Sequence, residues 1–509
     1  MLLFLPQLIL GAALLILIAS NVFQRGYRSS WLLTTAATGL ALVSSIFLRF
    51  RLPLSLNSSA WWAGEGLVSS ISFDLDSVAW QFALIVCGLF LAYLLLEVHK
   101  AISESWLNWA AGLAFAVSCL LAVVSGDLLT LAFFWVLVDA TTAILIFRLI
   151  LKFEQRHSAL EFLPANISAS FFLMAASILA GFSGQAASLL VLIAAALRLE
   201  IFAPSKMGNN LSELYLTQTC ILRLLPKASV LVLLARSAAL SGPVLIAVLV
   251  LIFLSTLINA LRWSRRDNGN GIEYFERGFA SLAILGSAIG QPGVALGFGL
   301  VAMTCSSALF LAQGAGRFKW LVVAPAILFF AGLPFSQVIS TGQAPGPGWM
   351  AVLFLPLHAL LLASWLRKPL VTSSSEPFGE PWMRTIRVSG LFIMPIIVLV
   401  FILAAPPSLS LETEFIWWPA VAVLLISILV FIVRERSQKI FIFPSSWVNL
   451  SNEFLSLFWL KTASSWVANI LGWILRTVNR VLEGQAGILW ALLLIVLLLS
   501  VASQFALGG

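Results

Sequence analysis

Long apolar runs separated by short polar connections make up most of this chain. Because a membrane-spanning helix needs about 20 predominantly apolar residues, the pattern predicts about sixteen spans. The segments near residues 194, 230 and 283 are short or contain charges and glycines, which is typical of broken membrane helices. The predicted spans centre near residues 11, 40, 88, 115, 138, 173, 194, 230, 252, 283, 303, 330, 358, 396, 425 and 495.

Residues 453–483 have a different pattern. Polar residues recur every three or four positions, and bulky apolar residues that include several tryptophans fill the places between them. This striping predicts an amphipathic helix that lies along the cytoplasmic membrane surface and contacts a neighbouring subunit. The alternative is a poorly formed extra span. We expect a terminal anchor span in residues 484–509.

Composition places the whole chain in the membrane. The 509 residues are 61% hydrophobic and only 10% charged, with a mean hydropathy of +1.03. A soluble fold cannot hide that much apolar surface. The net charge of +8 does not indicate nucleic acid, since Lys and Arg mark the cytoplasmic connections of membrane proteins.

The distribution of Lys and Arg predicts the orientation. With the N-terminus outside, the predicted inner connections carry most of the basic residues, and an even number of spans places both termini outside. The first segment lacks the basic start of a signal peptide, so we expect it to be a retained span. We expect the predicted outer loop over residues 50–78 to be ordered, and residues 369–383 to be a polar cytoplasmic linker.

The sequence offers no catalytic centre. The four cysteines are far apart and lack metal or redox spacing. We find no phosphate-binding loop, no cluster of metal ligands and no nucleophile with a nearby base. We expect no cofactor, and in particular no haem, flavin or iron–sulfur cluster.

A few ionisable residues lie inside predicted spans. They are Asp139, Arg198, Glu200, Lys227 and His358. A carboxylate in the middle of a span costs on the order of 3 kcal/mol, so such groups usually face a protein interior or a hydrated path. The set therefore predicts a chain of charged sites. The alternative is static pairing, for example of Asp139 with Arg198, that only holds helices together. For His358 the alternative is a buried hydrogen-bonded side chain.

Several segments resemble, in order, the antiporter-like membrane subunits of respiratory complex I, which are related to Mrp-type cation/proton antiporters. Residues 71–90 ("ISFDLDSVAWQFALIVCGLF") and 104–146 ("ESWLNWAAGLAFAVSCLLAVVSGDLLTLAFFWVLVDATTAILI") resemble the start of one family helix and the two helices that follow it. "LRLEIFAP" resembles the broken seventh helix, "PKASVLVLLAR" the eighth, and "FFAGLPFSQVISTG" the twelfth.

The resemblance implies an all-α polytopic membrane protein with about fourteen core helices in two inverted five-helix repeats that contain broken helices. The implied parts are N-terminal helices and an outer loop (1–104), a first repeat (105–240), a second repeat (241–368) and C-terminal helices (369–452), followed by the lateral helix and the anchor. Broken helices are expected near residues 198–206 and 222–228, where Pro204 and Pro226 lie close to charged residues.

The family's proton path uses a Glu on the fifth helix, a Lys on the seventh and a Lys or His on the eighth. The fifth-helix position falls on Val136, and Asp139, one turn later, is expected to face the same neighbour. The seventh-helix position holds Arg198, which can pair with Asp139 but does not release a proton. Lys227 matches the eighth-helix base. The resemblance also implies that Arg198→Lys is tolerated.

The second repeat keeps fewer of the family's residues. Ser307 and Gly342 fall near two of its lysine positions, and His358 matches no family position. The resemblance implies a proton- or Na⁺-translocating subunit of a larger membrane complex, with other membrane subunits as partners. The complex could be a complex I-type oxidoreductase, an Mrp-like antiporter or an inorganic-carbon uptake system in an energy-converting plasma membrane. The alternative is a structural paralogue that conducts no ions.

Overall fold

The computed structural model describes most of the chain up to residue 312 and parts of it up to residue 432. The described residues belong to a unit that spans Met1–Ser456, and a second unit, Leu457–Gly509, lies outside them. The predicted lateral helix and anchor, most of the linker 369–383, and the position of Gly342 also lie outside the described residues and stay predictions. The described ranges are 2–23, 30–57, 62–64, 67–69, 71–100, 104–150, 163–201, 216–237, 239–265, 271–312, 322–323, 354, 356–365, 381–404, 425–430 and 432.

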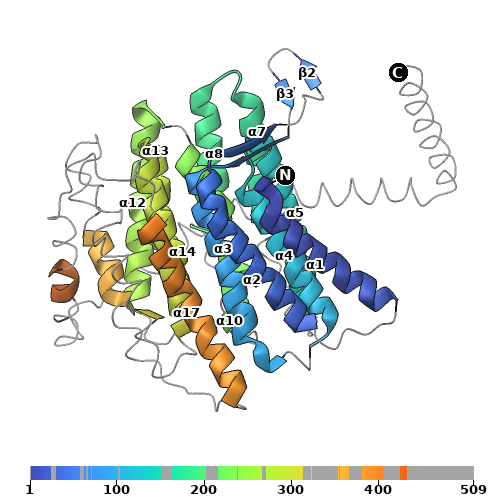
Figure 1. Cartoon of the computed structure of the whole chain (residues 1–509). Coiled ribbons are helices and arrows are strands. Elements are labelled where there is room, and N and C mark those ends of the chain that lie inside the picture. Colours follow the sequence, from blue (N-terminus) through green and yellow to red (C-terminus); the bar gives the residue numbers. More distant parts are fainter. Residues whose placement is uncertain are drawn as a thin grey trace, which may run out of the picture. The chain divides into compact units, whose positions relative to one another are not determined.

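The described part is mainly helical, and 9 of its helices are long and apolar enough to cross a membrane. This confirms a helical membrane protein. Figure 1 shows the helices running beside one another. They are α1 (Leu5–Val22), α2 (Ser30–Leu48), α3 (Ser77–Leu96), α4 (Trp106–Val123), α5 (Leu128–Leu149), α7 (Leu163–Leu179), α8 (Gly184–Arg198), α10 (Leu216–Leu224), α11 (Lys227–Arg236), α12 (Gly242–Arg265), α13 (Ile272–Ala288), α14 (Pro292–Ala312) and α17 (Pro381–Ala404), with a shorter helix over 356–365.

Four short strands depart from the all-α expectation. They are β1 (Leu54–Asn57), β2 (Trp62–Gly64), β3 (Leu67–Ser69) and β4 (Ser72–Leu75), which form two antiparallel pairs, β1 with β4 and β2 with β3. β4 also bonds to the turn between α4 and α5, because the Asp74 amide donates to the Val124 carbonyl at 2.8 Å. The outer loop is therefore ordered over its described residues, as predicted, but as strands.

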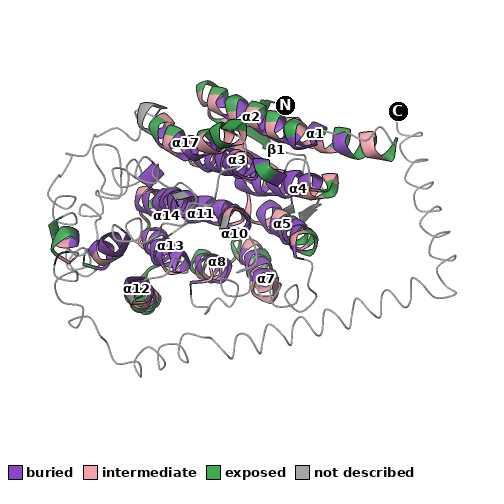
Figure 2. Ribbon diagram, turned by 90° about the horizontal axis from the view of Figure 1, so that it is seen from below, coloured by how far each residue is buried: buried purple, intermediate pink, exposed green. Residues whose placement is uncertain are grey.

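Helix α11 lies in the middle of the packed helices. It packs against α3, α4, α8, α13 and α14, and every residue from Lys227 to Ala235 is buried. Figure 2 shows α11 among purple, buried segments, while α12 at the border carries much green. In the most apolar part of the segment over 217–236, 94% of the residues are buried, whereas in that of α12 only 33% are. Charged residues on α10 and α11 must therefore find partners within the protein.

Both predicted breaks lie next to charged residues. α8 ends at Arg198, and Glu200 after it has a left-handed φ of 55°, which is uncommon for a residue with a side chain. The predicted single span near residue 230 is divided into α10 and α11 by a turn at Leu225 and Pro226. Proline has no amide hydrogen to continue a helical ladder, so it explains the second break. Most of the first predicted break, residues 202–206, lies outside the described residues.

Connections that the charge pattern assigns to the outside meet at one end of the helices, which we call the hairpin end. It contains the β1–β4 pair, the α4–α5 turn at 124–127, Arg236 and Ser237 at the end of α11, and residues 239–241. Arg236 joins the first two, since its Nη1 donates to the Ser125 carbonyl at 2.8 Å and its Nη2 donates to the Asp74 carbonyl on β4 at 3.1 Å. The same Nη2 also pairs with Asp76 Oδ1 at 3.0 Å. The amide of Leu240 donates to the Ala288 carbonyl at 3.0 Å, so the end of α13 also lies here.

Candidate functional site

Asp139 and Arg198 form a buried ion pair between α5 and α8. Arg198 Nη2 lies 2.9 Å from Asp139 Oδ1, and Nη1 lies 3.1 Å from Oδ2, so the guanidinium grips both carboxylate oxygens. Asn166 on α7 donates a further hydrogen bond to Oδ1 at 3.0 Å. Asp139 is only 5% exposed and Arg198 only 2%. The predicted pairing is confirmed, and Asp139 faces the interior of the protein.

Trp135 fixes the position of the arginine from a second side. The guanidinium carbon of Arg198 lies 4.6 Å from the centre of the Trp135 ring, and Nη2 also donates to the Trp135 carbonyl at 3.2 Å. The indole nitrogen of Trp135 donates to Ser229 Oγ on α11 at 2.9 Å. The pair thus connects to α11 through a buried tryptophan.

The prediction that Val136 and Asp139 face the same neighbour is wrong. Val136 is 54% exposed on the outer face of α5, whereas Asp139 is buried. Residues three apart differ by about 60° around a helix, which is enough to separate a lipid-facing from an inward position. The inward residue one turn before Asp139 is Trp135, which is fully buried.

A second site consists of six charged side chains from four segments, which we call the six-charge cluster. It comprises three carboxylates and three cations, so it is neutral when all six are ionised. All are buried except Glu200, whose side chain is 15% exposed. Its members are Glu200, Arg223, Lys227, Glu273, Glu276 and Arg277.

Lys227 belongs to this cluster and not to the Asp139 pair. Its Nζ lies 2.5 Å from Glu276 Oε1 and 3.8 Å from Glu200 Oε2. Pro226 is the N-cap residue of α11, so Lys227 is the first residue of this helix, directly beside the break. Among the described residues no ion pair joins Lys227 to Asp139. The two belong to neighbouring sites.

Arginines hold the remaining acids of the cluster. Arg223 Nη1 lies 2.9 Å from Glu273 Oε2, and its other nitrogens lie 3.6 Å from Glu200 and 3.7 Å from Glu276. Arg277 Nη2 lies 3.3 Å from Glu200 Oε2. Each carboxylate therefore has at least one cation in reach, which is how buried charges are kept in proteins.

Glu200 connects the two sites in the sequence. It is two residues after Arg198, and its left-handed backbone turns the chain at the end of α8. Arg198 contacts α5, while Glu200 contacts the cations of α10, α11 and α13. A strained residue of this kind costs about 1–3 kcal/mol and persists only where its surroundings hold it.

His358 lies apart in the second half of the chain. It is buried on the helix over 356–365, and its ring packs against Phe279 at 5.5 Å and Phe298 at 5.8 Å between centroids. Phe279 is on α13, close in sequence to Glu276 and Arg277. The predicted role of His358 in an ion path stays a prediction.

The sequence analysis missed four members of the cluster. Arg223, Glu273, Glu276 and Arg277 were not recognised as site residues, although α13 begins "IEYFERGFASLAILG" with three charges on an otherwise apolar helix. The spacing of Glu273, Glu276 and Arg277 puts them on one face of a helix. That pattern, next to the charges near residue 230, was the available signal.

The chemistry available to these residues is proton transfer between ionisable side chains that are held next to one another. Arginine stays protonated in proteins, so only the carboxylates and Lys227 can exchange protons. Among the described residues, no group of three or more His, Cys, Asp or Glu is placed to hold a metal ion. The four cysteines are buried, and no disulfide forms among them.

Comparison with known proteins shows which solved structures share this fold. No family model matches the chain, and no curated protein matches it in sequence. Among solved structures, it is similar to a chain of the Mrp complex from a Dietzia species, with a TM-score of 0.63, 16% identity and 98% of this chain covered. It is also similar to a chain of respiratory complex I from Thermus thermophilus (TM-score 0.58, 18% identity, 79% covered).

A chain of an archaeal membrane-bound sulfane sulfur reductase, described as a respiratory membrane complex, is similar as well, with a TM-score of 0.60, 14% identity and 85% of this chain covered. The chain shares the fold of these chains from Mrp, complex I and related respiratory membrane complexes. It spans 63% of the length of the Mrp chain, but 98% and 99% of the other two. At these identities the likeness concerns the fold, and residue roles must be argued from the site.

Proposed function

We propose that this chain is a proton- or Na⁺-translocating membrane subunit of a larger complex. The observation that carries the proposal is the row of buried ionisable side chains at the broken helices of this antiporter-like fold. It runs from Asp139 and Arg198 through Glu200 to Lys227 and Glu276. Buried ionisable groups inside membrane proteins are expensive and mark ion pathways.

Lys227 is the proposed proton carrier, and Asp139 is the proposed gate. Lysine can lose its proton when desolvated, whereas Arg198 cannot. A carboxylate held by a fixed guanidinium stays ionised while the pair is closed. Opening of the Asp139–Arg198 pair would leave the Arg198 cation without its carboxylate, two residues before Glu200. The changed electrostatic potential would then act on Lys227, which contacts both Glu200 and Glu276. His358 is proposed as a titratable group of the second half.

The two inverted repeats over 105–240 and 241–368 are part of the proposal. α10 and α11 supply the broken element of the first repeat. The proposed setting is an energy-converting plasma membrane with both termini outside, supported by the meeting of predicted outer connections at the hairpin end. The partners are other membrane subunits, as in the complexes that contain the structural neighbours.

The genes that neighbour this one would identify which complex contains the chain. A complex I-type oxidoreductase, an Mrp-like antiporter and an inorganic-carbon uptake system each bring different subunits. The competing function is structural, with the six-charge cluster acting only as a fixed link between helices. The poor match of the second half to the family's lysine pattern favours that alternative.

Asp139→Asn separates the two functions. In vesicles that contain the assembled complex, we expect this variant to lose most proton or Na⁺ flux, because the neutral amide cannot respond to movement of Arg198. Assembly should persist, since Asn keeps the shape and can still accept hydrogen bonds from Arg198. Glu104→Gln, which changes a partly exposed carboxylate at the opposite end of the helices, is the control. Normal flux with Asp139→Asn in an intact complex would favour the structural role.

A further inference from the structure

One face of α2, and of the 3₁₀ turn η2 (Arg49–Arg51) that continues it, is exposed. Its large apolar side chains follow one another at helical spacing, which keeps them within one face. Figure 2 shows α2 at the border of the packed helices with much green on its surface. Because residues 30–51 are apolar and long enough to cross a membrane, bilayer lipid has access to this face. The exposed side chains are Leu32, Leu40, Val43, Phe47 and Phe50.

This exposed face ends in two arginines at the hairpin end. Arg49 and Arg51 flank Phe50, which is 81% exposed, and β1 begins three residues after Arg51. Arg51 is exposed, and among the described residues it makes no ion pair and no hydrogen bond. Lys and Arg usually gather on the cytoplasmic connections, whereas we expect this connection outside. The two cations therefore need a reason other than topology.

Trp80 holds Arg49 in place at the end of α2. The guanidinium carbon of Arg49 lies 5.6 Å from the centre of the Trp80 ring, which is within the range of a cation–π contact. Trp80 is itself only 1% exposed, and its indole nitrogen donates to the Ser45 carbonyl at 2.8 Å. The ring contact fixes the position of the cation and leaves its charge unneutralised.

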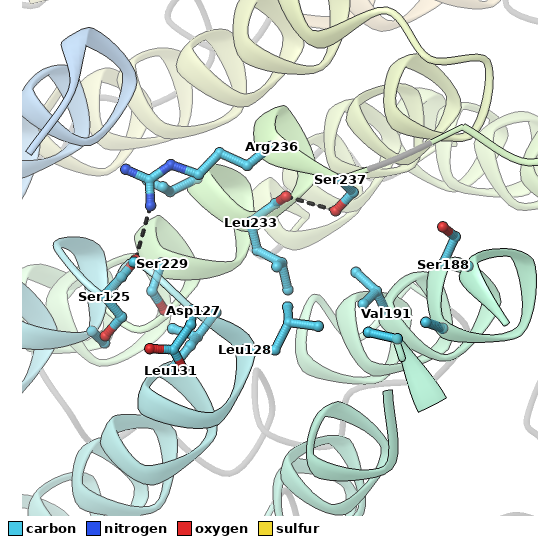
Figure 3. Close-up of a pocket in the computed structure, with 16 residues that line it drawn as sticks. Ser125, Asp127, Leu128, Leu131, Ser188, Val191, Ser229, Leu233, Arg236 and Ser237 are labelled. Carbon is cyan, nitrogen blue, oxygen red and sulfur yellow. Dashed lines mark hydrogen bonds between the residues drawn. The ribbon is translucent and has the colours of Figure 1, made fainter. Parts of the chain in front are cut away.

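The carboxylates of the hairpin end are engaged elsewhere. Asp76 pairs with Arg236, whose guanidinium also donates to the Ser125 carbonyl (Figure 3). Asp127 accepts hydrogen bonds from two backbone amides. The carboxylate of Asp74 lies beside the α4–α5 turn, where a Cβ added at position 126 would meet its Oδ2 at 2.6 Å. None of these acids pairs with Arg51.

We propose that Arg49, Phe50 and Arg51 bind an anionic phospholipid in the membrane leaflet at the hairpin end. The two guanidinium groups take the phosphate, which matches their forked arrangement of donors. Phe50 and the apolar face of α2 lie against the acyl chains. A zwitterionic lipid carries a positive charge beside its phosphate, so it fits two cations less well. This binding is independent of the proposed ion transport.

Lipid retention by the full chain tests the proposal. The chain is placed in nanodiscs with equal amounts of phosphatidylglycerol and phosphatidylcholine, and native mass spectrometry measures the ratio of the two lipids that stay bound. The normal chain should retain more phosphatidylglycerol. Arg51→Gln should lower the ratio roughly fivefold, and Arg49→Gln combined with Arg51→Gln should lower it further, as expected for cations at an anionic membrane surface.

Arg148→Gln is the matched control, because Arg148 is an exposed arginine opposite the hairpin end that bonds to Asn108. Its lipid ratio should equal that of the normal chain. Because Arg51 has no described protein partner, Arg51→Gln should also unfold at the same temperature as the normal chain, so that lost lipid does not reflect unfolding. An unchanged ratio in Arg51→Gln, or an equal fall in Arg148→Gln, overturns the site.

Two other occupants give different results. Inorganic phosphate in millimolar excess should leave the lipid ratio unchanged, and loss of the preference for phosphatidylglycerol would show that the arginines bind a free anion instead. Purification of the assembled complex tests a protein partner. If Arg51→Gln keeps the normal lipid ratio but no longer purifies with the other subunits, this face binds protein and the lipid proposal is wrong.

Discussion

At the scale of single residues, the decisive contacts are those of long cationic side chains with more than one partner. Arg198 contacts both oxygens of Asp139, the carbonyl of Trp135 and the face of its ring. Lysine can supply the charge but not the planar fork that makes these contacts together. Whether residue 198 is arginine or lysine should therefore affect the stability of the fold more than it affects the net charge of the pair.

Arg198→Lys should keep ion flux, because the positive charge remains beside Asp139, but should lower the free energy of unfolding by about 1–3 kcal/mol through lost hydrogen bonds to buried groups. Thermal unfolding of the purified chain in detergent measures this loss. Arg148→Lys is the control, since Arg148 makes an exposed hydrogen bond to Asn108, and its effect should stay within about 0.5 kcal/mol. Equal midpoints of thermal unfolding for the two variants would show that the forked guanidinium contacts of Arg198 add no stability.

Variants of Lys227 and Glu276 test whether Lys227 carries protons or only links helices through its ion pair. Lys227→Met leaves a buried carboxylate without its nearest cation, and breaking a buried pair in this way costs about 3–5 kcal/mol. Lys227→Met combined with Glu276→Gln should recover most of that stability, since no charge is left unmatched. Flux should stay lost in the double variant if Lys227 carries protons. Recovery of flux together with stability would assign the pair a structural role only.

At the scale of elements, close backbone approach decides how α13 presents its charges. A Cβ on Gly286 would lie 2.4 Å from the Ala295 amide nitrogen, so α13 and α14 meet through their main chains at this point. This approach fixes α13, whose other end carries Glu273 and Glu276 toward α10 and α11. The position of the acids thus depends on a glycine several turns away.

Gly286→Ala should destabilise the protein by about 1–3 kcal/mol, because backbone atoms of α14 cannot move aside cheaply. Gly39→Ala on α2 is the matched control, as nothing lies within 4 Å of its added Cβ, and alanine favours a helix over glycine. The midpoints of thermal unfolding should fall for the first variant and stay level or rise for the second. A neutral Gly286→Ala would mean that the two helices separate without cost.

At the scale of the whole molecule, orientation follows from charge and from which connections share an end. Arg148 at the end of α5 bonds to Asn108 at the start of α4, so these ends lie opposite the hairpin end. Lys100 and Arg262 belong to the connections that the charge pattern assigns to the cytoplasm. We therefore expect the hairpin end to lie outside.

An impermeant thiol reagent checks this orientation. Ser55→Cys should react in intact cells, and Ser105→Cys, the exposed residue before α4, should react only in inside-out vesicles. Loss of the Ser105 cap costs about 1 kcal/mol, which a membrane helix of this length tolerates. The reverse labelling pattern would show that the topology is inverted.

The sequence by itself determined what depends on local information. Apolar runs of membrane length predicted a helical membrane protein, Pro226 predicted the break before Lys227, and two opposite charges inside spans predicted the contact of Asp139 with Arg198. Each inference needed only span length, a helix breaker or the cost of a lone buried charge.

Only the tertiary structure decided which charges meet and which face each helix turns inward. Lys227 and Glu276 are 49 residues apart, and no local pattern links them. The environments of Val136 and Asp139 depended on the rotation of α5, which its neighbours fix and its nearly uniform apolar sequence does not. A cavity also arises where α4, α5, α8 and α11 meet, and its mostly apolar lining, with a few polar side chains such as Ser125 and Ser229, cannot be recognised one helix at a time.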